Sequence, residues 1–219
     1  MNSTLKSFIL DSLAIILGVF ITFAFQEWID RAHDRKEVRS ALWLVRTEIL
    51  TNLEDVNTLR DYLKQERASA QYLINHRNDL DSCPVDSVQY HSGMILAEVN
   101  ASVSNDALEM LKSSSLFQKL GNSLLAMKII RAYDSCNLIM EMVDDHITAR
   151  NARFENSINE NNVNKISTDG GIDIPEFIRT DYGLYSMKWL ANQIIIEQTS
   201  DISDVDEALK SIDDYIRRH

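Results

Sequence analysis

The stretch that decides the fold is ALWLVRTEILTNLEDVNTLRDYLKQERASA, residues 41–70. Its apolar residues follow a seven-residue rhythm, and they are Leu42, Val45, Ile49, Val56, Leu59, Leu63 and Ala70. A repeat of seven predicts a helix that presents a narrow apolar seam to another helix. Two arrangements satisfy such a seam: packing within the same chain, or a coiled coil between subunits. Asn52 lies in the seam, where a polar residue is expected to fix the register in either arrangement.

The helix that carries this seam is expected to be long in both directions. No glycine or proline occurs between Val19 and Cys83, so nothing in the sequence interrupts it there. The break comes at residues 78–86, which contain Cys83 followed by Pro84. We therefore predict one helix that begins upstream of the seam and ends close to residue 80.

The composition favours an all-α fold for the rest of the chain. Only 6 glycines and 2 prolines occur in 219 residues, and 45% of the residues are apolar. Further helices are predicted at 86–99, from about 106, at 123–156, from Pro175, within 183–198 and from 203 onward. The predicted organisation is a tail at 1–7, a transmembrane helix at 8–28, an extension helix at 29–80 and an antiparallel helical bundle at 81–219 completed by that extension. Residues 157–174, rich in Asn and Gly, are predicted to form a flexible loop.

The transmembrane prediction rests on the run FILDSLAIILGVFITFAF, residues 8–25, in which Asp11 is the only charge. Extended to Trp28, the segment has about the 20 residues that cross a hydrocarbon core of about 30 Å. Trp28 would mark the far interface. Asp11 either reaches the headgroups or meets a buried partner in an assembly of helices. Gly18 offers a flat place where another helix could approach.

Charge limits the partners and leaves the orientation open. A net charge of −11 argues against nucleic acid as a partner, because phosphate binding needs a basic surface. Lys and Arg are more numerous after the apolar run than before it, which favours a cytoplasmic domain by the positive-inside rule. The lipid bilayer and other copies of the chain or other membrane subunits are the expected partners.

No motif for catalysis, cofactor binding or a metal is found. Cys83 and Cys136 are either unrelated thiols or one disulfide, which would need an oxidising compartment. No two histidines are three or four residues apart, so no pair of histidines has the spacing that would bind a metal on one face of a helix. The acidic cluster around His146, with Glu141, Asp144 and Asp145, is interpreted as a solvated helix face.

Two signatures resemble an uncharacterised family of small bacterial proteins that have one N-terminal membrane span and a helical extracytoplasmic domain. In the first, Asp11, Gly18 and Trp28 stand at the family's spacing, with Asp11 in place of the usual Glu. The second consists of Leu111-Lys112-Ser113-Ser114, Asn122, Ile129, Ile130 and Tyr133-Asp134. Leu108 and Ser115 depart from the family's common aromatic residue and Gly. The resemblance implies a domain on the periplasmic side of the bacterial inner membrane, and it implies no activity.

The leading hypothesis is a membrane-anchored interaction, scaffold or sensor protein that is oligomeric and is not an enzyme. An alternative is an ion-coupled subunit that uses Asp11, because one span with an acid in its first third is similar to the stator subunits of bacterial proton-driven motors. A second alternative is an unrecognised enzyme, which would need a deep pocket lined by Glu141, Asp145 and His146.

Overall fold

In the computed structural model, the backbone is described for residues 3–160 and 173–218, and side chains are described for residues 13, 15–155 and 173–218. Every regular element in this part of the chain is helical, which confirms the all-α prediction. The long helices are α1 (Ser3–Asn75), α5 (Ser123–Glu160) and α9 (Ser203–Arg218). The shorter ones are η1 (Leu80–Ser82), α2 (Val85–Leu96), α3 (Asp106–Ser113), α4 (Leu116–Lys119), α6 (Ile174–Arg179), α7 (Asp181–Asn192) and α8 (Ile195–Gln198).

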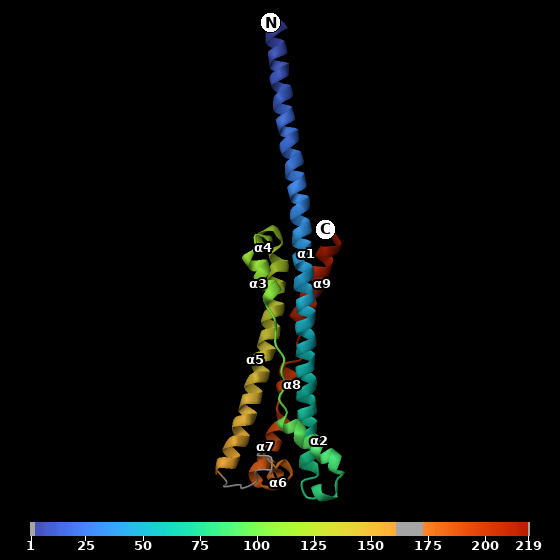
Figure 1. Ribbon diagram of the computed structural model, residues 1–219, viewed down its shortest axis with the longest axis vertical. Coiled ribbons are helices and arrows are strands. Elements are labelled where there is room, and N and C mark those ends of the chain that lie inside the picture. The colour runs from blue at the N-terminus through green and yellow to red at the C-terminus, as the bar shows by residue number, and fades with distance from the viewer. Residues whose placement is uncertain (1–2, 161–172, 219) are drawn as a thin grey trace.

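Helix α1 forms one side of a narrow bundle and continues well beyond it toward the N-terminus (Figure 1). Helix α5 runs alongside α1 in the same direction, since side-chain contacts join Tyr133 to Glu48 and, further along both helices, His146 to Glu66. Helix α9 runs in the opposite direction to both, because Arg46 bonds to Asp213 near the end of α9 and Arg60 bonds to the Ser200 carbonyl just before its start. The prediction of an antiparallel bundle is therefore not confirmed.

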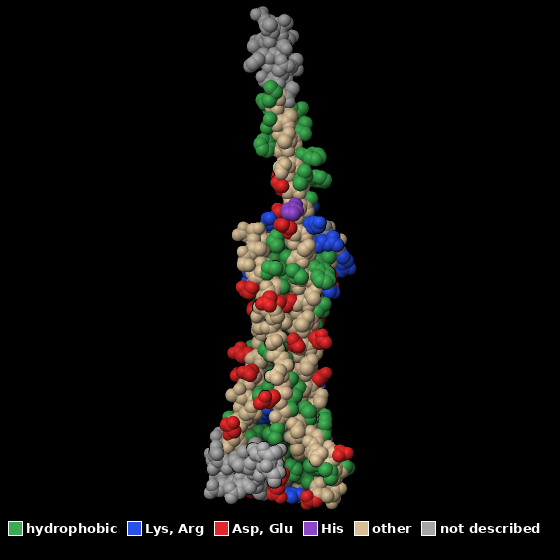
Figure 2. All heavy atoms as spheres, in the orientation of Figure 1, with side chains coloured by type: hydrophobic (Ala, Val, Ile, Leu, Met, Phe, Trp, Pro, Cys, Tyr) green, Lys and Arg blue, Asp and Glu red, His purple; other side chains and the backbone are tan. Residues whose placement is uncertain are grey.

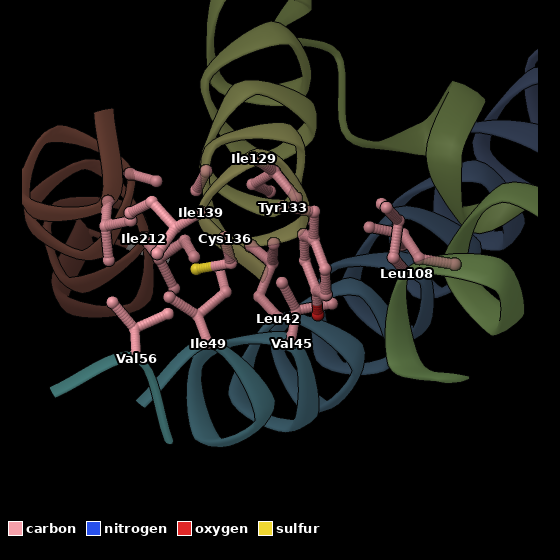
Figure 3. Packing of buried hydrophobic residues seen from close by; sticks show 14 of the residues in the cluster. Leu42, Val45, Ile49, Val56, Leu108, Ile129, Tyr133, Cys136, Ile139 and Ile212 are labelled. Carbon is pink, nitrogen blue, oxygen red and sulfur yellow. The ribbon is translucent and has the colours of Figure 1, made fainter. Parts of the chain in front are cut away.

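The seven-residue seam of α1 lies in the main core. Leu42, Val45, Ile49, Val56 and Leu63 are each no more than 1% exposed. They pack against α5 and α9, whose contributions include Ile129, Tyr133, Cys136, Ile139 and Ile212 (Figure 3). Within the single chain the seam is thus already covered by neighbouring helices, as the first of its two predicted arrangements requires.

The two parallel helices are connected by a segment that returns along the bundle between them (Figure 1). Residues 97–105 have no regular structure, and Ala97, Val99, Ala101 and Val103 pack at alternate positions against the main core. Such alternation is what an extended chain produces, because its side chains point to opposite sides in turn. The sequence prediction of a helix through residue 99 was wrong, since α2 ends at Leu96.

Asn52 and Glu48 hold the end of this returning segment against α1. The Asn52 amide donates to the Ser104 carbonyl at 2.8 Å and accepts from the Ser104 N–H at 2.9 Å. The Glu48 carboxylate accepts from the Ser104 hydroxyl at 2.6 Å and from the Ala107 N–H at the start of α3. Asn52 therefore fixes the position of the returning segment. Its hydrogen-bond partner is the Ser104 backbone rather than a side chain of a second helix.

A second, smaller core closes the end of the bundle that is farther from the N-terminus. It consists of Ala70, Leu73, Leu80, Ile95, Phe154, Ile174, Phe177, Ile178, Met187 and Leu190. Asp173 caps α6 by accepting from the Glu176 N–H, and Pro175 occupies the first turn, as the sequence predicted. Helix α5 continues to Glu160, so the predicted loop starts later than 157, and residues 161–172 of it lie outside the described part.

Candidate functional site

The segment of α1 beyond the bundle carries large apolar side chains that no described part of the chain covers. Its exposed residues are Leu13, Ile15, Ile16, Leu17, Val19, Phe20, Ile21, Phe23, Phe25, Trp28 and Ile29. Figure 2 shows hydrophobic side chains on both sides of the projecting helix. Below it, Asp and Glu side chains are scattered over the visible surface of the bundle. Successive residues of a helix point about 100° apart, so Ile15, Ile16 and Leu17 alone cover its circumference. We call residues 13–29 the apolar projection.

A helix that is apolar on all sides is normally buried. In the apolar projection the described contacts are local: the Thr22 hydroxyl donates to the Gly18 carbonyl at 2.9 Å, and the Phe25 and Trp28 rings lie 5.9 Å apart. A Cβ added at Gly18 would meet nothing within 4 Å, so this position is open to an approaching surface. Trp28, predicted to anchor the segment, is 62% exposed. No described part of the chain covers the projection.

The prediction that residues 8–28 span a bilayer is corrected. Over the residues that the structure describes, no helix combines the length and the apolar character needed to cross a membrane. The predicted single-pass location in the bacterial inner membrane is corrected with it.

Asp11, on which the ion-coupled alternative depends, lies outside the residues whose side chains are described. Gly18 and Trp28, which the family resemblance grouped with it, both lie in the exposed apolar projection. The three predicted anchor residues therefore share one helix but do not meet, because residues seven and ten positions apart are separated by two or three turns.

A groove extends from the base of the apolar projection onto the bundle. Its lining comes from α1 and from the connection between α3 and α4, and consists of His33, Lys36, Glu37, Ser40, Ala41, Leu44, Met110, Ser114, Ser115 and Leu116. The volume is about 550 Å³. Leu44 and Met110 are 46% and 43% exposed, so apolar surface continues from the projection into the groove. Lys119 binds Asp34 at 2.7 Å beside it and ties α4 to α1.

Between the two cores lies a buried charge cluster of Glu66, His146 and Arg150. One Glu66 oxygen lies 2.6 Å from His146 Nε2, and the other accepts from Arg150 at 2.9 Å. Arg150 also donates to the Ala97 carbonyl at 3.0 Å and to the Tyr62 hydroxyl. Trp189 of α7 stacks on the His146 ring with a centroid distance of 5.3 Å. The cluster joins α1, α5, α7 and the returning segment in one place.

The electrostatics of this cluster favour a charged Glu66. Burial alone would raise the pKa of the Glu66 carboxyl, but the hydrogen bond and charge of His146 and the charge of Arg150 hold it below its ordinary value. Burial, together with the negative charge of Glu66, raises the pKa of Tyr62 to about 12, so this phenol keeps its proton. Because Glu66 and Arg150 are no more than 1% exposed, the cluster is an internal junction.

Sequence reasoning missed this junction because its members come from distant parts of the chain. A usable signal was present: Tyr62 and Glu66, and likewise His146 and Arg150, stand four residues apart on faces that are otherwise apolar. The acids that the sequence grouped with His146 do not join it. Glu141, Asp144 and Asp145 are exposed while His146 is buried, so the pocket required by the enzyme hypothesis does not form from these residues.

The proposed disulfide is not present, because Cys83 and Cys136 are both free. Cys136 lies in the main core on α5, where burial raises the pKa of its thiol to about 11 (Figure 3). Cys83 follows η1 at the end of the bundle that holds the second core. The two thiols are therefore unpaired in this fold, which agrees with the interpretation of two unrelated thiols.

Comparison of the chain with models of known protein families, with curated proteins and with solved structures found no match. The resemblance noted in the sequence therefore stays a prediction.

Proposed function

We propose that the protein is a non-catalytic helical interaction protein that associates with a second copy of itself through the apolar projection. The single observation that carries the proposal is the set of large apolar side chains at residues 13–29, which surround the helix and are left exposed by every residue that the structure describes. Exposed apolar surface of this extent is a feature of interaction sites. The bundle then serves as a rigid body that holds the projection away from the rest of the chain.

Charge at the base of the projection favours a parallel arrangement of two copies. In parallel helix pairs, a residue on one helix commonly faces the residue five positions later on the other. Asp30 and Arg35 have this spacing and opposite charges, and both are exposed. Two parallel copies would thus form two Asp30–Arg35 pairs, whereas an antiparallel pair would place this mixed-charge segment beside apolar side chains.

The proposal is tested by disulfide cross-linking in a Cys83→Ser background. The one native thiol left, that of Cys136, is buried and is not expected to react. Ala24→Cys is expected to give a cross-linked dimer under mild oxidation, because the seven-residue pattern that faces Asp30 with Arg35 places residue 24 of both copies at the centre of the contact. Gln71→Cys is the matched control, exposed on the same helix but near its other end. It is expected to remain uncross-linked.

The charge pairing is tested in the same assay. Asp30→Arg alone is expected to reduce the yield of the Ala24→Cys dimer, and addition of Arg35→Asp is expected to restore it. A chain that sediments as a monomer at all concentrations and gives no Ala24→Cys dimer would overturn the proposal. So would a chain that floats with phosphatidylcholine vesicles as a monomer, because lipid would then be the partner.

A further inference from the structure

Three side chains of different chemistry converge where α1 ends and the chain turns into η1. The ligand atoms of His76, Asp79 and Cys83 all lie within 4.8 Å of one another. His76 Nδ1 is 3.4 Å from an Asp79 carboxylate oxygen, and Cys83 Sγ is 3.7 Å from the Asp79 carbonyl. An imidazole, a carboxylate and a thiol thus face a common point within eight residues of sequence.

The backbone holds these three residues in place without help from a ligand. Consecutive turns are closed by hydrogen bonds from the Asp79 N–H to the His76 carbonyl at 3.0 Å and from the Cys83 N–H to the Leu80 carbonyl at 3.1 Å. Leu80, between them, is buried in the second core and pins the turn to the bundle. Pro84 keeps Cys83 extended, with ψ at 153°, which is the conformation that a residue before proline prefers.

An independent observation is that the His76 ring nitrogen facing this point lacks a hydrogen bond. His76 Nδ1 is inaccessible to solvent and has no hydrogen-bond partner, although the Asp79 oxygen is near it. The ring is held by Tyr72, whose centroid lies 4.6 Å away. A buried polar atom without a partner is costly, and in native proteins such an atom often marks the position of a bound ion or water. The orphaned nitrogen therefore points to a ligand.

We propose that His76, Asp79 and Cys83 form a binding site for a divalent transition metal of the zinc class. Thiolate and imidazole ligands select such metals, whereas Ca²⁺ and Mg²⁺ prefer sites built from oxygen atoms. Zinc bonds of about 2.0–2.3 Å imply ligand separations of about 3.3–3.8 Å in a tetrahedron. The 3.4 Å between His76 Nδ1 and the Asp79 oxygen lies within this range, and all three ligand atoms lie within 4.8 Å of one another. On binding, the Cys83 thiol releases its proton to solvent, and the fourth position of the tetrahedron is left to water.

The site is tested with the full chain and with Co²⁺ as a spectroscopic substitute for Zn²⁺. Addition of Co²⁺ is expected to produce thiolate-to-cobalt charge-transfer absorption that saturates at one metal per chain and is displaced by Zn²⁺. Cys83→Ser is expected to abolish this absorption, and His76→Gln to weaken Zn²⁺ binding at least about tenfold in isothermal titration calorimetry. Circular dichroism establishes that both variants keep their helical fold.

Two matched controls separate this site from incidental binding. Cys136→Ser removes the other thiol, and Asp81→Asn removes a neighbouring exposed acid, so both are expected to bind Zn²⁺ with unchanged affinity. Zn²⁺ affinity that survives Cys83→Ser unchanged, or Co²⁺ binding without charge-transfer absorption, would overturn the proposal. The metal site and the self-association of the apolar projection are independent, because Cys83 and residues 13–29 lie at opposite ends of α1.

Discussion

Glu66 is a residue whose charge must be balanced inside the protein. Its carboxylate is fully buried, and both oxygens are occupied by groups from α5. Removing one member of such a cluster leaves the others buried and uncompensated, which is more costly than the cluster's net contribution to stability. The junction between the two cores therefore depends on every member being present and correctly charged.

Glu66→Gln is accordingly expected to lower the free energy of unfolding by about 3–5 kcal/mol, because Arg150 would keep its buried charge without a counter-charge. Urea denaturation at neutral pH measures the change. Glu54→Gln, an exposed position on the same helix, is the control and is expected to change stability by less than about 0.5 kcal/mol. Equal effects of the two variants would contradict the importance of the buried cluster.

Acid should weaken the native protein through the same residue. The pKa of Glu66 is lower in the folded chain than its ordinary value of 4.5, so the folded state favours the charged carboxylate. This contribution is complete above the unfolded pKa and is lost as pH falls through the folded one. The urea concentration at the unfolding midpoint of the native protein is therefore expected to decrease as the pH is lowered below 4.5. The decrease is expected to be smaller in Glu66→Gln. A parallel decline in both proteins would assign the acid sensitivity to other groups.

The contact between α6 and α7 depends on a glycine. A Cβ at Gly183 would lie 1.9 Å from the Phe177 carbonyl oxygen, which belongs to backbone and cannot rotate away. The Gly183 N–H also donates to the Thr180 hydroxyl oxygen at 2.9 Å, which caps α7, so the start of α7 cannot shift without losing that bond. The two helices approach this closely only because residue 183 has no side chain.

Gly183→Ala is expected to destabilise the protein by about 1–3 kcal/mol or more, since the backbone of α6 must move. Gly93→Ala provides the opposite case, because a Cβ at this exposed position of α2 meets nothing within 4 Å. That variant is expected to gain about 0.5–1 kcal/mol, the usual advantage of Ala over Gly in a helix. Thermal unfolding followed by circular dichroism compares them, and a shift of the same sign in both would refute the close approach.

At the level of elements, the seam of α1 could be predicted from its periodicity. Contacts made by irregular backbone could not be predicted in this way. A spacing of seven places Leu42, Ile49 and Val56 on one face wherever the partner comes from. The returning segment at 97–105 has no such pattern, and its anchor is the Ser104 backbone rather than a side chain. The convergence of His76 and Cys83 was missed for a related reason, since it is created by a turn after the helix ends.

The whole molecule consists of a bundle with two cores and a projection that packs against neither. The buried residues of α1 begin at Val38, so the helix upstream contributes no described side chain to the core. Association and folding are therefore separable properties of the chain, one belonging to the projection and the other to the bundle.

Deletion of residues 1–30 is expected to leave the free energy of unfolding of the monomeric bundle within about 0.5 kcal/mol of its original value. Deletion of 203–219 is the contrasting variant, because α9 buries Val205, Ala208 and Ile212 in the main core. That variant is expected to lose its cooperative transition. Chemical denaturation of both at low protein concentration provides the comparison, and loss of folding in the first would show that the projection stabilises the bundle.

The continuity of α1 gives the molecule a mechanical property. From Leu13 to Asn75 the helix extends over roughly 90 Å without an interruption, and both cores are attached to its lower part. The helix therefore has one segment that projects freely and one segment that is held by the two cores. A partner that tilts the projecting segment would therefore load first the contacts near Val38, where the helix enters the bundle.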